Sequence, residues 1–138
     1  MDVALELGIP CGGWCPKGRR AEDGRIPDFY PLQEASSPDY PVRTRLNVED
    51  SDGTLVIAEG SPKGGTALTL KLARQLNKPF LLVDLGRNAD PSEVREWVRK
   101  TPIQVLNVAG PREGEAPGIH DEAARFLREV LLARPADR

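Results

Sequence analysis

The residues of this chain best suited to chemistry are two adjacent glycines and a threonine in the stretch GTLVIAEGSPKGGTALT. Gly64 and Gly65 follow an apolar run that predicts a buried strand over residues 54–58, and they precede helical periodicity from Thr66. At such a junction, free backbone N–H groups and the helix dipole attract an anion, and the lack of side chains lets a phosphate approach the amides. Thr66 can cap the helix or donate its hydroxyl to the same anion. The alternative is that the glycines only form a tight turn, because their spacing matches neither GxGxxG nor the P-loop pattern.

A basic loop, WCPKGRRAEDG, holds the second group of candidate residues. Lys17, Arg19 and Arg20 place three cations within four positions, a cluster that can hold a phosphate or another multiply charged anion. The alternative is a solvated basic loop whose charges are balanced by Glu22 and Asp23.

A second strand-to-loop junction, NVAGPRE, adds an amide, a glycine and two charged side chains. In open α/β folds, such junctions converge on a crevice at the carboxyl edge of the sheet. Asp84, about 20 residues after the glycines and at the end of the next strand, can accept a hydrogen bond from a ribose hydroxyl there. The predicted set has no paired nucleophile and base, so it favours binding of a phosphorylated, ring-containing small molecule over catalysis. The junction's predicted members are Asn107, Gly110, Arg112 and Glu113.

The elements that must position these residues alternate between strands and helices. After Thr66, the recurrence of Leu68, Leu72 and Leu76 predicts a helix that Asn77 can end in a left-handed conformation. Asp90 begins a capping sequence for a helix over 91–100, helical periodicity predicts another helix over 119–133, and Gly8 is the expected stop of a helix over 2–7. Because strands joined by helices imply parallel pairs, we predict a three-layer α/β sandwich with a mostly parallel sheet of four or five strands, in one domain over residues 1–138. The other predicted segments are strands over 80–83 and 103–108, helices over 2–7 and 43–50, a short strand over 9–13, and a surface loop over 29–42.

The composition limits the kind of partner. A net charge of −2 argues against general binding of nucleic acid or a membrane surface. No apolar stretch approaches the length of a membrane span, and the two cysteines form no secreted disulfide framework, so the expected location is the cytoplasm. A structural zinc site is not expected, because the chain offers few of the usual ligands: Cys11, Cys15 and the single histidine, His120.

Several runs together resemble one known family: GIPCGGWCPKGRRAEDGRIP, RTRLNVEDSDGTLVI, KGGTALT and VLNVAGPRE. They closely resemble the "putative molybdenum carrier" proteins, the circularly permuted YpsA-like branch of the SLOG superfamily, over nearly the whole chain. The resemblance implies a Rossmann-like α/β fold, and a ligand that is the molybdenum cofactor, a nucleotide or a nucleotide derivative. The resemblance favours a carrier function, and the alternative function is that of a nucleotide N-glycosidase or phosphoribohydrolase.

That alternative comes from a more distant similarity to the LOG-type phosphoribohydrolases, whose PGGxGTxxE signature corresponds to SPKGGTALT here. Where that motif has its catalytic glutamate, this chain has Leu68, Thr69 and Leu70. Glu113 and Glu59 are the carboxylates left for an enzymatic role.

The amino end also departs from the family pattern, which begins with a strand and a GGQTGxDR-type loop. Met1 corresponds to the helix that follows that loop, so we expect a late start or a truncated member. A missing central strand would expose sheet edges, and we therefore expect poor ligand binding and a marginally stable or oligomeric protein.

Overall fold

A computed structural model of the chain describes residues 1–21, 24–87, 89–111 and 116–132. Its centre is a three-stranded parallel sheet in the order β6-β5-β7. The middle strand is buried along its whole length, because it has a strand on either side and helices on both faces. The strands are β5 (Gly53–Ala58), β6 (Phe80–Asp84) and β7 (Leu106–Ala109).

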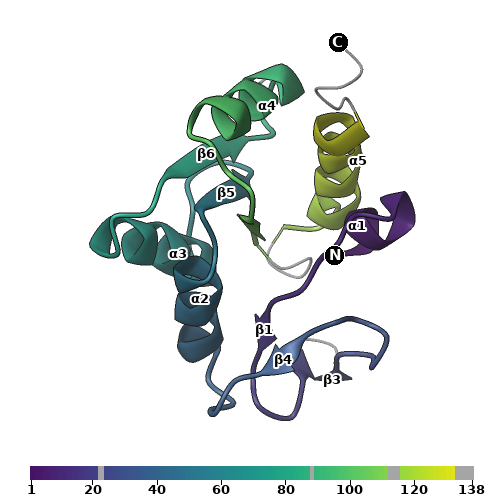
Figure 1. The fold of residues 1–138 in the computed structure, drawn as a ribbon, viewed down its shortest axis with the longest axis vertical. Helices are drawn as coiled ribbons and strands as arrows, with labels where there is room; N and C mark the ends of the chain where they lie inside the picture. Colours follow the sequence, from purple (N-terminus) through teal and green to yellow (C-terminus); the bar gives the residue numbers. More distant parts are fainter. Residues whose placement is uncertain (22–23, 88, 112–115, 133–138) are drawn as a thin grey trace.

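Two pairs of helices cover the two faces of this sheet (Figure 1). On one face, Val48 of α2 (Tyr40–Glu49) packs against the leucine stripe of α3 (Gly64–Gln75), as the helical periodicity predicts. On the other face, Leu55 and Ile57 pack against α4 (Pro91–Lys100) and α5 (Ile119–Leu132). The predicted three-layer α/β architecture is therefore confirmed.

Local signals explain where the helices begin and end. Asp90 caps α4, since its carboxylate accepts a hydrogen bond from the backbone N–H of Ser92 at 2.9 Å. Asn77 follows α3 in the left-handed conformation, with φ of 54°, and Pro79 prevents continuation. Gly8 ends α1 (Asp2–Leu7) with φ of 71°, as predicted.

The region before α2 forms two small sheets beside the main one (Figure 1). β1 (Trp14–Cys15) pairs in parallel with β4 (Gln33–Glu34), and β2 (Arg20–Ala21) pairs antiparallel with β3 (Gly24–Arg25). Asn47 of α2 fastens this region, because its side chain bonds both the N–H and the C=O of Trp14, at 2.8 and 3.1 Å. These short strands pair with each other, so the main sheet contains three strands among the described residues, where we predicted four or five.

Several predicted boundaries were wrong. The strand predicted over 9–13 lies instead at Trp14–Cys15, and the loop predicted over 29–42 contains β4 and the start of α2. The strand predicted from Ile103 begins at Leu106, because the backbone N–H groups of Gln104 and Val105 bond the Asp52 carboxylate in a turn. The helix predicted from Thr66 begins two residues earlier, so both glycines belong to its first turn.

Candidate functional site

The junction between β5 and α3 presents free backbone donors to solvent. Gly64 and Gly65 are exposed, and within the described residues their N–H groups donate to no acceptor. Lys63, the residue that precedes the helix, makes no side-chain cap. Thr66 does not cap the helix, because α3 begins two residues before it; its predicted donation of a hydroxyl to the anion stays a prediction. Two adjacent amides at a helix start therefore remain available to an anion.

Asp84 joins the carboxyl ends of β5 and β6. Its Oδ1 accepts hydrogen bonds from the backbone N–H of Gly60 at 3.1 Å and of Gly86 at 2.9 Å. Arg87 Nε lies 3.6 Å from the other carboxylate oxygen. These two backbone donors, first Gly60 and then Gly86, lower the pKa of Asp84 below its usual value of 3.8. The predicted ribose acceptor thus already organises the loop that leads to Gly64.

This carboxylate makes part of the protein's stability depend on pH. Because the pKa of Asp84 is lowered on folding, the stabilisation is present above the unfolded value and is lost as the pH falls through the folded one. Asp84→Asn keeps an acceptor oxygen but removes the titration. We expect urea unfolding at about pH 5 and about pH 3 to show a larger loss of stability for the native protein than for the variant. Equal losses for the two proteins would contradict this.

The structure separates Asn107 from Gly110, the two described residues among the four predicted at the β7 junction. Gly110 lies at the carboxyl edge, where a Cβ built on it would be 2.6 Å from the carbonyl oxygen of Ile57. Asn107 lies inside the sheet, in register with Thr54 at the start of β5, and its Nδ2 donates to the Thr54 hydroxyl at 3.3 Å. Four residues of strand, about 13 Å, separate that position from the end of β5. Arg112 and Glu113 lie outside the described residues.

Arg19 has a structural role in place of the predicted one. Its guanidinium is buried and donates to the backbone carbonyls of Ile26, Pro27, Tyr30 and Leu32 at 2.8 to 3.3 Å. Four of its five N–H donors are engaged by carbonyls, and the Asp28 carboxylate lies 3.7 Å from Nε, so this side chain is held by the protein itself. Sequence spacing groups the three basic side chains, but the fold of the segment that contains β2 and β3 turns the Arg19 side chain inward.

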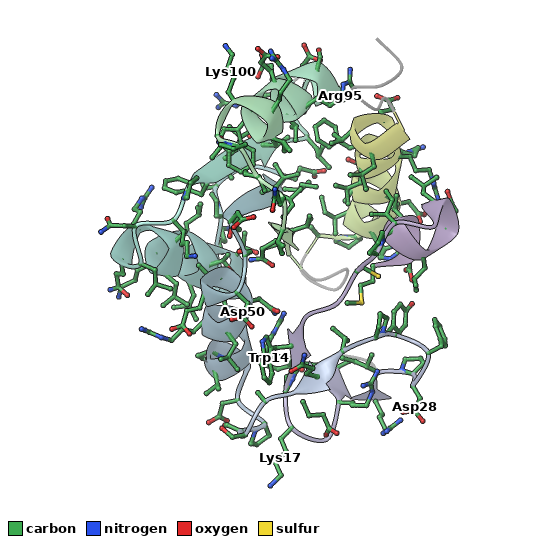
Figure 2. The ribbon with its side chains drawn as sticks, viewed as in Figure 1. Trp14, Lys17, Asp28, Asp50, Arg95 and Lys100 are labelled. Carbon is green, nitrogen blue, oxygen red and sulfur yellow. The ribbon has the colours of Figure 1, made fainter. Side chains whose placement is uncertain are left out.

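The other two members of the basic loop differ from Arg19. Lys17 is exposed and points away from the protein at the opposite end from Arg95 and Lys100 (Figure 2). The backbone of Arg20 lies in β2, and its side chain is outside the described part of the structure.

The sequence reasoning missed Gly60 and Gly86, the two donors that hold Asp84. An Asp-x-Gly sequence directly after an apolar strand was the available signal, because an aspartate side chain often accepts from the backbone two residues on. Glu59 is exposed beside the same loop. Among the described residues, no group of three or more histidine, cysteine, aspartate or glutamate side chains is placed to hold a metal ion. None of the helices described is long and apolar enough to cross a membrane.

Comparison with known proteins gives two matches. The model of the "Circularly permutated YpsA SLOG family" matches residues 1–131. The fold is similar to the crystal structure of a "Putative molybdenum carrier protein" from Syntrophus aciditrophicus SB, with a TM-score of 0.89 and 47% sequence identity. That similarity covers 94% of this chain and 84% of the other. No curated protein matches the chain.

Proposed function

Because the chain belongs to the circularly permutated YpsA SLOG family, we propose that it is a carrier that binds a phosphate-bearing small molecule. The ligand is the molybdenum cofactor or a nucleotide-derived molecule, in keeping with the carrier description of the similar protein from Syntrophus aciditrophicus. The observation that carries the proposal is the pair of exposed residues Gly64 and Gly65 at the start of α3, whose amides have no acceptor within the described part of the chain.

The donor set at this junction suits a phosphate group better than a bare metal ion. Backbone N–H groups at a helix start bind anions, whereas metal ions need lone-pair donors in clusters. A Cβ built on Gly65 would meet no atom within 4 Å, so there is open space beside its amide. A molybdenum-bearing ligand would therefore be held through its phosphate, and its metal would come with the bound molecule.

The remaining proposed residues serve this junction in different ways. Asp84 orders the loop through Gly60, and Gly110 lets the end of β7 lie close to β5. The other residues that stay proposed for ligand binding are Thr66, Lys17, Arg20, Arg112 and Glu113. Arg19 and Asn107 are left out, because their side chains bond the Pro27 carbonyl and the Thr54 hydroxyl.

A negative charge placed beside the amides should weaken anion binding without destabilising the helix. Gly65→Asp introduces a carboxylate in the first turn of α3, where the helix dipole tolerates it. Repulsion between unit charges about 4 Å apart is about 1–4 kcal/mol, so we expect binding at least about fivefold weaker. Calorimetric titration with inorganic phosphate, adenosine monophosphate and guanosine monophosphate measures this.

Gly65→Ala is the matched control, because it adds no charge and its Cβ meets no neighbour. It should bind the same probes within about threefold of the native protein. Native-like binding by Gly65→Asp would show that the anion lies elsewhere, and a native protein that binds none of the three probes would contradict the phosphate site. Mass spectrometry of the purified protein, with molybdenum analysis, then identifies the natural ligand.

A further inference from the structure

The outer edge of β6 is an uncovered sheet edge. Among the described residues, β6 pairs only with β5, so one side of its backbone has no strand beside it. The strand, FLLVD, has neither proline nor a charged residue before Asp84, and these are the usual means of blocking an edge. Leu82, at its middle, is 43% exposed. Such an edge is suited to pairing with another strand.

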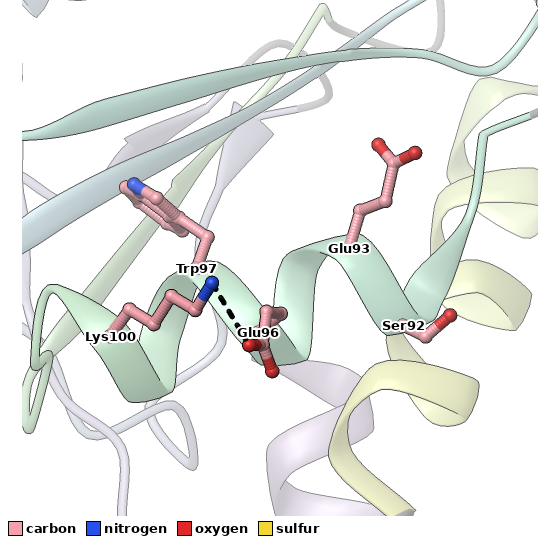
Figure 3. A pocket seen from close by; sticks show the side chains of 5 residues that line it. All are labelled: Ser92, Glu93, Glu96, Trp97 and Lys100. Carbon is pink, nitrogen blue, oxygen red and sulfur yellow. Dashed lines mark ion pairs between the residues drawn. The ribbon is translucent and has the colours of Figure 1, made fainter.

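A hollow of about 240 Å³ lies along this edge, lined by Leu81 to Asp84 and by the first residues of α4, including Glu93 and Val94. Glu93 also lines a second, shallow hollow on α4, with Trp97 and Lys100 (Figure 3). The two hollows therefore form one continuous region, the edge surface, which consists of the outer edge of β6 and the side of α4 that carries Glu93, Trp97 and Lys100.

That side of α4 is turned away from α5: Glu93 and Lys100 are exposed there, and Trp97 is half-buried against the core beneath the helix. Arg95 donates to the Glu129 carbonyl of α5 at 2.8 Å, so its side of the helix faces α5. Spacings of four and three residues place Glu93, Trp97 and Lys100 on one side of α4. Glu93 is about 200° around the helix from Arg95. Figure 3 shows Glu93 and Trp97 projecting on the same side of α4. Tryptophan is enriched at the centres of protein interfaces, and the accessible part of Trp97 borders this surface.

The charges along the edge surface run from basic to acidic. Because β5, β6 and β7 are parallel, α4 must run back along β6, and its start lies at the carboxyl end of that strand. The basic end holds Arg74, which lies over the Phe80 ring of β6, and Lys100 of α4, and the acidic end holds Asp84, Asp90 and Glu93. Each end also holds one charge of the opposite sign. At the acidic end Arg87 is paired with Asp84, and at the basic end Glu96 is paired with Arg99 and Lys100.

We propose that the edge surface binds the same surface of a second copy of this chain across a two-fold axis. Antiparallel pairing of two β6 strands about Leu82 places each basic end opposite an acidic end, so the surface is complementary to itself. The axis passes close to Leu82 and places Phe80 opposite Asp84 of the other copy. The two three-stranded sheets become one six-stranded sheet, with the two α4 helices side by side on one face.

Leu82→Lys tests the strand pairing, because it sets two like charges next to each other at the axis. Sedimentation velocity over a concentration series should show a dimer for the native protein, and a dissociation constant at least about tenfold larger for the variant. The matched control is Val108→Lys, on the opposite edge strand of the sheet and also 43% exposed in the native protein. This control should change dimerisation less than about twofold.

A charge exchange tests the orientation. Glu93→Lys and Lys100→Glu should each weaken the dimer, whereas the double variant should restore it, because antiparallel helices place position 93 opposite position 100 of the other copy. Thermal melts establish that all variants fold. A monomeric native protein, dissociation by Val108→Lys in place of Leu82→Lys, or a double variant no better than the singles would each overturn the proposal.

Discussion

Gly110→Ala is expected to lower the free energy of unfolding by about 2–3 kcal/mol. The added Cβ would lie 2.6 Å from the carbonyl oxygen of Ile57, a distance that real Cβ atoms do not reach. That oxygen belongs to the central, fully buried strand, so it cannot move aside as a flexible side chain would. Urea unfolding of both proteins, followed by circular dichroism, measures the difference.

Gly65→Ala is again the control, since the same substitution meets open space there. Alanine is also the better helix former, so we expect this variant to be as stable as the native protein or slightly more so. If Gly110→Ala were equally harmless, β7 would not approach β5 as the structure describes.

Arg19→Lys is expected to lower the free energy of unfolding by about 2–3 kcal/mol, although it preserves the positive charge. Lysine cannot reproduce the planar fork with which Arg19 bonds Ile26, Pro27, Tyr30 and Leu32. Among the described residues, the carbonyls of Ile26 and Leu32 have no other donor, and they would lose this one beside a buried side chain. The measurement is urea unfolding, as for Gly110.

This variant distinguishes structure from ligand binding, because a residue that only neutralised a ligand would tolerate lysine without loss of stability. Lys17→Arg, two residues away and exposed, is the control and should leave stability within about 0.5 kcal/mol of the native value. Equal stability of Arg19→Lys and Lys17→Arg would return Arg19 to the set of ligand-binding residues.

The sequence predicted correctly those features that depend on neighbours along the chain. The leucine stripe of α3, the Asp90 cap of α4 and the left-handed Asn77 each depend on residues within a turn or two. The runs shared with the family are also read directly along the chain, so the family assignment and the α/β architecture were available before any coordinates.

Only the tertiary structure decided what each candidate side chain touches. Arg19 is bonded to carbonyls 7 to 13 residues away, Asn107 to Thr54 across 53 residues, and Asp84 to Gly60 across 24. No local pattern contains these partners, since they are brought together by strand register and by the path of the loops. The uncovered edge of β6 was also decided by the tertiary structure, because a strand's place in the order of a sheet is a property of the whole fold.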